Sequence, residues 1–211
     1  MKVTIELFQA LNEIADSPLN DFQKSIEFVK IMTKKNEFEI EKMSVRKFNK
    51  ICNFINKKFV KWNDKTLNGK PKKMIFVNGK AYKINYDILQ LNAGRYVEVM
   101  EFSKENAVKN LHKILASIVV PMKFTITGFK ELPYRAEDHE HLANEMLQAD
   151  YDDIFHALVF FYAVLKISIE NLNTYGKTTE EAIAVRLLRH SLKFSDGFIK
   201  PNWYRSLTEL N

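Results

Sequence analysis

A run of nine consecutive apolar residues, Ala157 to Leu165, constrains the fold of this chain more than any other feature. It lies inside Asp152–Asn171, a stretch without Gly or Pro. Asp152 and Asp153 precede the run, and carboxylates favour a helix N-terminus, where N–H groups are unpaired and the dipole is positive. A helix that is apolar all round must be covered on every side. We therefore predict a buried helix near 152–171 with other helices packed around it.

The composition is that of a folded and mainly helical protein. The chain has 211 residues, of which 46% are hydrophobic, and this is enough for a sizeable core. Six Gly and five Pro are few and scattered, which disfavours a sandwich or barrel with many tight turns. The single cysteine, Cys52, excludes an internal disulfide and a multi-cysteine metal site. Nine apolar residues are fewer than the roughly 20 that cross a bilayer, so we expect no membrane contact.

Residues 1–72 predict an N-terminal helical part. Thr4 can cap a first helix that Ser17-Pro18 ends, and a second helix follows with Phe22, Ile26 and Val29 on one face. Ser44 caps the clearest amphipathic helix, Val45–Phe59, whose apolar residues recur every three and four positions. Residues 61–72 have no period and several turn formers, so we predict a basic loop there.

Residues 73–211 predict a hairpin followed by the helical core, in one compact unit with the N-terminal part. Asn78-Gly79 tolerates the positive φ of a tight turn, which favours a β-hairpin near 73–86. An isolated hairpin is marginal, so we expect a further strand, Lys123–Phe129, to pair with it. Helices are predicted over Leu91–Phe102, Glu105–Val119, Glu137–Leu147 and Thr178–Leu192. The predicted fold class is mainly α with a small β element, that is, α+β.

The C-terminal tail is rich in large apolar side chains that would be costly in water. We therefore expect it to pack on the body or on a neighbouring subunit. The predicted subunit-interface residues are Phe198, Trp203, Tyr204 and Leu207.

Positive charge is concentrated between Lys42 and Lys80. This segment contains twelve Lys or Arg against one acid, Asp64, so it carries +11 and the rest of the chain carries −5. Such asymmetry indicates a surface that faces nucleic acid or an acidic protein, and phosphate contacts of this kind bind without sequence preference. A solvated lysine-rich face is the alternative. The predicted contact residues are Arg46, Lys50, Lys57, Lys58, Lys61, Trp62, Lys65, Lys70, Lys72 and Lys73, with Trp62 exposed for stacking.

The densest group of possible metal ligands is Glu137–His141, with Glu145 four residues further on. Carboxylate and imidazole can hold zinc or iron, but the pattern is not HExxH and no second cluster completes it. A solvated first helical turn is the simpler interpretation. The six glycines are isolated, so no phosphate-binding loop or dinucleotide fingerprint is present. We expect no metal, no cofactor and no enzymatic activity.

Six short segments follow one another along the chain: Ile26–Ile51, Gly79–Tyr82, Gly94–Val97, Asn110–Ala116 up to Pro121, Glu137–His139 and Phe160-Phe161. In this order they resemble small virion-associated or tail-assembly proteins of crAss-like tailed bacteriophages of gut Bacteroidales. The resemblance extends over about residues 20 to 165.

The resemblance implies a non-enzymatic component of the portal, neck or tail, or a packaged cargo protein, that acts by subunit packing. It implies a homo-oligomer or other virion subunits as partners, and a location in the virion, with the host cytoplasm during assembly. Two alternatives remain open: a tail-assembly chaperone and a sequence-independent nucleic-acid-binding protein.

Overall fold

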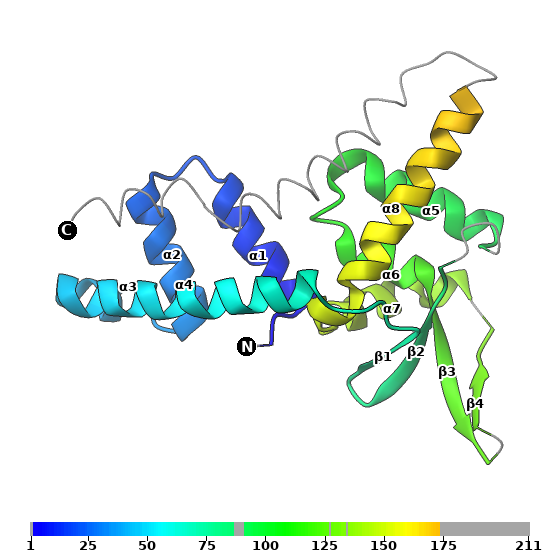
Figure 1. Cartoon of the computed structure of the whole chain (residues 1–211), viewed down its shortest axis with the longest axis horizontal. Helices are drawn as coiled ribbons and strands as arrows, with labels where there is room; N and C mark the ends of the chain where they lie inside the picture. The colour runs from blue at the N-terminus through cyan, green and yellow to red at the C-terminus, as the bar shows by residue number, and fades with distance from the viewer. Residues whose placement is uncertain (1, 87–90, 127, 134, 174–211) are drawn as a thin grey trace. The chain divides into compact units, whose positions relative to one another are not determined.

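The computed structural model describes residues 2–86, 91–126, 128–133 and 135–173 of the chain. These residues are mainly helical and contain one four-stranded antiparallel sheet, so the predicted α+β class is confirmed. They form two compact units (Figure 1): unit 1 contains Ala10–Asn68, and unit 2 contains Lys2–Gln9 and the described residues from Gly69 to Asn173. No helix in the described ranges is long and apolar enough to cross a lipid bilayer.

Unit 1 is built from the end of α1 (Ile5–Asp16) and from α2 (Asp21–Thr33), α3 (Glu37–Glu41) and α4 (Val45–Leu67). Side chains fix where these helices begin. Asn20 accepts a hydrogen bond of 2.9 Å from the Gln23 backbone, and the Gln23 side chain accepts one from the Asn20 backbone, which completes a capping box. Asn36 and Glu39 repeat this arrangement at α3. The break after Asp16 lies at Ser17-Pro18, as predicted.

Helix α4 is longer than we predicted. The segment 61–72 was predicted as a basic loop, but its first seven residues continue the helix to Leu67. Trp62 and Thr66 extend the buried spacing of Phe59, and the Thr66 hydroxyl donates to the Trp62 carbonyl at 2.9 Å. The burial of this last turn outweighs the turn-forming residues that suggested a loop.

The N-terminal residues of the chain belong to unit 2. The backbone of residues 3–6 exchanges hydrogen bonds with that of residues 147–151, including Ile5 N to Ala149 O at 3.0 Å and Tyr151 N to Val3 O at 2.8 Å. Thr4 accepts from the Leu7 N–H, as predicted for an N-cap. The Phe8 ring stacks on Tyr151 with centroids 4.0 Å apart.

The sheet of unit 2 has the order β1 (Met74–Val77), β2 (Lys80–Ile84), β3 (Val119–Thr125) and β4 (Gly128–Glu131). The predicted hairpin is confirmed, because Asn78 and Gly79 take φ values of 50° and 79° between β1 and β2. In Figure 1 the two hairpins extend away from the helices of the same unit.

The predicted pairing strand Lys123–Phe129 is wrong in its bounds. The strand β3 begins at Val119, pairs with β2 through Ala81–Ile84, and the chain turns after Thr125 into β4. Gly128 has a φ of 112°, which favours glycine, and it opens β4 where we predicted a strand interior. The helix α5 (Ala93–Asn106) confirms the helix predicted over Leu91–Phe102. The helix predicted over Glu105–Val119 is shorter, because α6 spans only Leu111–Ile118 and Val119 already belongs to β3, in which Pro121 lies opposite Tyr82.

A short 3-10 turn, η2 (Ala136–Asp138), precedes α7 (His139–Met146), and α8 (Tyr151–Asn173) follows. Ile154, Ala157 and Phe161 of α8 are buried, which confirms the predicted core helix. Its predicted coverage on every side is wrong, because Val159 and Phe160 are 39% and 45% exposed. The predicted helix Thr178–Leu192 and the C-terminal interface residues lie outside the described residues.

Candidate nucleic-acid interface

The helix α4 presents one apolar and one basic face along its whole length. Ser44 accepts a hydrogen bond from the Lys47 backbone N–H at 3.4 Å and begins the helix. From there, residues spaced by three and four positions are buried on one side. The buried residues are Phe48, Cys52, Ile55, Phe59, Trp62 and Thr66.

Aromatic contacts fix the orientation of α4 within unit 1. Phe48 lies 5.9 Å from Phe22 of α2, and Phe59 lies 5.3 Å from Phe28 of the same helix, measured between ring centroids. Phe59 also meets Trp62 edge to face at 5.8 Å. Because α2 covers this side, the opposite side of α4 must face solvent.

The solvent side of α4 carries almost all of its charge. We define the basic face of α4 as the exposed cations Arg46, Lys47, Lys50, Lys57, Lys58 and Lys61. Lys65 is exposed on the same helix one turn further on, and Asp64 is the one carboxylate of α4. None of the six residues of the basic face forms an ion pair with another described residue.

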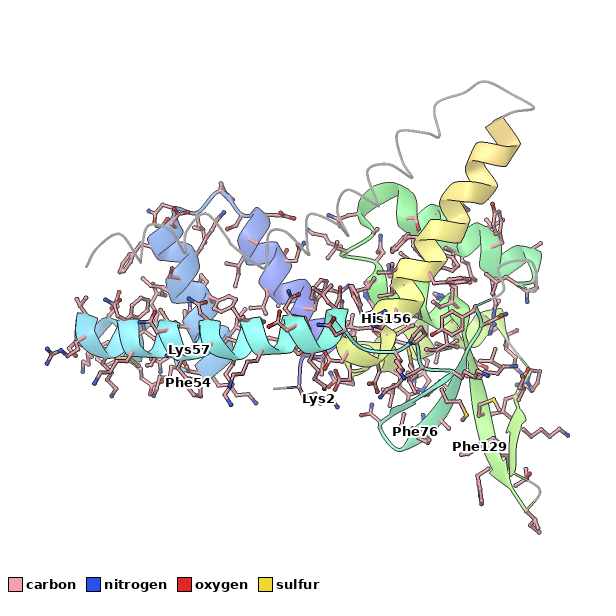
Figure 2. All side chains as sticks on the ribbon, viewed as in Figure 1. Lys2, Phe54, Lys57, Phe76, Phe129 and His156 are labelled. Carbon is pink, nitrogen blue, oxygen red and sulfur yellow. The ribbon has the colours of Figure 1, made fainter. Side chains whose placement is uncertain are left out.

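An exposed aromatic ring lies within the basic face. Phe54 is 62% exposed, and helical spacing places Lys50, Lys57 and Lys58 three or four residues from it. The Lys58 ammonium lies 5.4 Å from the centroid of the Phe54 ring. Figure 2 shows Phe54 and Lys57 on α4. A ring flanked by cations can stack on a nucleobase while the cations contact phosphates.

Phe54 takes the place that we predicted for Trp62. Trp62 is only 5% exposed and packs on Phe59 in the interior of unit 1, so it cannot stack on a base. The prediction was wrong because it treated residues 61–72 as a loop. The signal for Phe54 was present in the sequence, since Phe54 falls between the apolar positions of the predicted amphipathic helix.

The other predicted contact residues divide between the two units. Arg46, Lys50, Lys57, Lys58, Lys61 and Lys65 lie on α4 in unit 1. Lys70, Lys72 and Lys73 lie in unit 2, where the Lys72 ammonium contacts Asp153 at 2.5 Å. The candidate interface is therefore the basic face of α4, without the segment that follows the helix.

Cys52 is a core residue of α4, as predicted. It lies on the apolar face and is buried. Burial raises the pKa of its thiol from 9.0 to about 11, so the thiolate is disfavoured at neutral pH. This thiol is accordingly a poor nucleophile in the folded protein.

The possible metal ligands Glu137–His141 do not converge. His139 is buried, whereas Glu140 and His141 are exposed. Glu145 accepts from Lys80 at 3.0 Å and from the hydroxyl of Tyr82. Within the part of the chain that the structure describes, no group of three or more His, Cys, Asp or Glu side chains is arranged to hold a metal ion.

A serine, a histidine and a carboxylate meet inside unit 2. Ser117 Oγ lies 2.9 Å from His139 Nε2 and 3.2 Å from Glu98 Oε2, while His139 Nε2 lies 3.7 Å from Glu98 Oε2. In a catalytic triad the carboxylate and the serine hydroxyl contact different ring nitrogens, whereas here both approach Nε2. Ser117 is also fully buried. This cluster ties α5, α6 and α7 together and does not activate a nucleophile.

No family model, curated protein or solved structure matches this chain. Among the described residues, the basic face of α4 is the group whose chemistry points most directly to a ligand.

Proposed function

We propose that the protein binds nucleic acid without sequence preference through the basic face of α4. The observation that carries the proposal is the set of six exposed cations on one helix face, without ion-pair partners among the described residues and with exposed Phe54 among them. Such a surface fits the phosphate backbone of a nucleic acid, because binding releases the counterions that are condensed on that backbone.

The residue types favour contacts to the backbone over recognition of base sequence. Five of the six cations are lysines, which act as point charges toward phosphates. Arg46 is the one guanidinium of the basic face, so bidentate reading of guanine edges contributes little. Affinity should therefore depend on salt and length more than on sequence.

Phe54 favours unpaired strands over duplex. Its ring is exposed, and the faces of unpaired bases are free to stack on it, at about 1–3 kcal/mol per base. In duplex DNA those faces are covered by neighbouring base pairs. We expect Phe54→Ala to weaken binding of a labelled oligothymidine by about tenfold and to leave duplex binding unchanged.

The decisive experiment compares two charge-matched double variants by fluorescence anisotropy. Lys57→Glu/Lys61→Glu changes the basic face of α4, and Lys123→Glu/Lys130→Glu changes two exposed lysines of the sheet in unit 2 by the same net charge. The α4 variant should lose at least about tenfold in affinity, and its salt slope should fall by about two. The sheet variant should retain most of its affinity. Equal losses in both variants would contradict binding at α4 and indicate a general attraction of the charged protein.

We also propose, as a second candidate function, that the protein is a bacteriophage virion component acting by subunit packing. The sequence resemblance motivates it, and an exposed aromatic surface on the sheet of unit 2, with Phe76 and Phe124 64% and 74% exposed, supports subunit contacts. Quantitative mass spectrometry of purified particles should find many copies per particle. Abundance in infected cells with absence from particles would contradict this candidate and favour a tail-assembly chaperone or a free nucleic-acid-binding protein.

A further inference from the structure

One face of the sheet in unit 2 is apolar and open to solvent. Phe76, Phe124 and Phe129 are 64%, 74% and 45% exposed, and Ile126 at the tip of the second hairpin is fully exposed. Figure 2 labels Phe76 and Phe129 on the strands. Monomeric proteins rarely leave several large apolar side chains together in water.

Strand register places these residues on a single face. Directly paired residues point to the same side of a sheet, and the register aligns Phe76 with Ala81 and Ala81 with Met122. The next row of this face pairs Phe124 with Phe129. We call the set Phe76, Ala81, Met122, Phe124 and Phe129 the aromatic sheet face. Ile126 lies in the turn that follows β3.

The rings of the aromatic sheet face form one continuous cluster. The Phe129 centroid lies 5.5 Å from that of Phe124 and 6.4 Å from that of Phe76, both edge to face. The small Ala81 lies between Phe76 and Met122, and it is only 6% exposed although its face is open. The phenylalanine rings therefore project from the sheet beside the recess at Ala81, and side chains of another surface can interdigitate with them.

The opposite face of the same sheet is covered along β1 and β2. Ile75 and Tyr82 point to that side and are almost completely buried. Burial raises the pKa of the Tyr82 hydroxyl, which also donates to Glu145 of α7. Along β1 and β2, this side of the sheet therefore belongs to the core of unit 2, whereas Lys123 and Lys130 further along β3 and β4 are exposed on it. The aromatic sheet face has no covering layer among the described residues.

Charge decides which kind of partner fits the aromatic sheet face. Of the paired strand residues that the structure describes, the charged ones on this side are Lys83 and Glu131, and their side chains contact each other at 2.5 Å. The face therefore has no net charge. Nucleic acid would need unpaired cations here, because phosphate contacts supply most of its binding energy. A strongly charged protein would meet no complementary excess.

We propose that a second copy of this chain covers the aromatic sheet face in a two-fold dimer. In such an isologous contact the same surface of both copies forms the interface. A neutral face that carries one cation and one anion can therefore be complementary to the same face of a second copy. The proposed axis lies between Lys83 and Glu131 and perpendicular to the line that joins them, because this placement brings Lys83 of one copy to Glu131 of the other. Two sheets stacked in this way pack their side chains in a layer about 10 Å thick. This interface is independent of nucleic-acid binding by α4.

Sedimentation equilibrium of the full chain tests the dimer with two variants in the same strand. Phe124→Glu places a charge on the aromatic sheet face and should raise the dimer dissociation constant at least about 30-fold, as expected of a central interface aromatic. Lys123→Glu points to the opposite face and should leave the dissociation constant within about threefold of wild type. A wild-type chain that sediments as a monomer, or a dimer that Phe124→Glu leaves intact, would overturn the proposal.

A mixing experiment separates a second copy from any other occupant. Lys83→Glu and Glu131→Lys each leave two like charges on the face, so each variant alone should dimerise at least about tenfold more weakly. An equimolar mixture of the two should recover the wild-type affinity as a heterodimer, because each copy then carries the charges opposite to those of its partner. Failure of the mixture to associate more strongly than either variant alone would overturn the two-fold arrangement.

Discussion

The basic face of α4 and the aromatic sheet face are both exposed, but hydration affects them in opposite ways. The lysines of α4 are well solvated and need no partner, so that surface is stable alone and gains free energy from a polyanion through counterion release. The phenylalanine rings of the sheet are poorly hydrated, and their burial against a complementary apolar surface is favourable. Binding at the two proposed surfaces should therefore respond to different conditions.

The largest difference between buried and exposed aromatic residues should appear in folding stability. Phe59 is buried on the apolar face of α4, and Phe59→Ala should lower the free energy of unfolding by about 3–5 kcal/mol. Phe124→Ala should change it by less than about 0.5 kcal/mol, because this ring is mostly exposed in the single chain. Urea unfolding at protein concentrations below the dimer dissociation constant measures both. A large loss for Phe124→Ala would mean that the aromatic sheet face is covered within the chain.

Salt should separate the two surfaces almost as strongly. If about five phosphates are contacted by α4, raising salt from about 50 to about 200 mM should weaken the binding of duplex DNA about 500-fold and that of single strands about 130-fold. The same change should alter the dimer dissociation constant by less than about threefold, because apolar burial is not screened. Anisotropy titrations and sedimentation at matched salt concentrations give the two slopes. Equal salt dependence of nucleic-acid binding and of dimerisation would contradict the assignment of polyanion binding to α4 and of apolar contact to the sheet.

Alkaline pH should lower the free energy of unfolding through the buried thiol of Cys52 in unit 1. Burial raises the pKa of the thiol from 9.0 in the unfolded chain to about 11 in the folded protein. The folded state therefore binds the thiol proton more tightly than the unfolded chain does. The resulting contribution to the free energy of unfolding is fully present below pH 9 and falls by about 2–3 kcal/mol as the pH rises through 11. Cys52→Ala should remove this part of the pH dependence.

The control for that prediction lies in unit 2. Burial also raises the pKa values of Tyr82 and Tyr151, so both wild type and Cys52→Ala should lose further stability above pH 10. Urea unfolding at pH 8 and pH 11 gives the difference between the proteins. Equal losses in wild type and Cys52→Ala would show that the thiol does not contribute.

The smallest expected effect concerns the turn that joins β1 to β2. Gly79 has a φ of 79°, and a Cβ added there would meet no atom within 4 Å. Gly79→Ala should therefore cost only the backbone strain of the left-handed region, about 1–2 kcal/mol. Gly79→Asn should cost less, because asparagine tolerates this conformation. Equal costs for alanine and asparagine, measured by thermal unfolding, would point to a clash instead of strain.

Local signals in the sequence predicted the elements whose ends are set by nearby residues. Ser44 predicted the start of α4, Asn78-Gly79 predicted the first hairpin, and the Ala157–Leu165 run predicted the core helix. Each depends on backbone preferences or apolar spacing within a few residues. The end of α4 was missed because it depends on packing of Trp62 and Thr66, which tertiary contacts decide.

The second hairpin and the aromatic sheet face required the register of the strands. The sequence KFTITGF alternates like a strand, but pairing with β2 begins upstream at Val119 and uses the segment that contains Pro121. Only this register shows that Phe76 and Phe129, more than fifty residues apart in the chain, share one cluster. Within the candidate interface, the lysines of α4 were predictable from the distribution of charge. That Phe54 and not Trp62 is the exposed aromatic residue depended on where the helix ends.

The place of Lys2–Gln9 in unit 2 has a consequence for proteolysis. These residues are held by backbone hydrogen bonds to residues 147–151, while unit 1 lies between them and Gly69 in the chain. A protease that cuts once within unit 1 therefore leaves the first few residues attached to unit 2 by non-covalent contacts. Two bands on a denaturing gel should then correspond to one particle under native conditions, and the nicked chain should separate only when unit 2 unfolds.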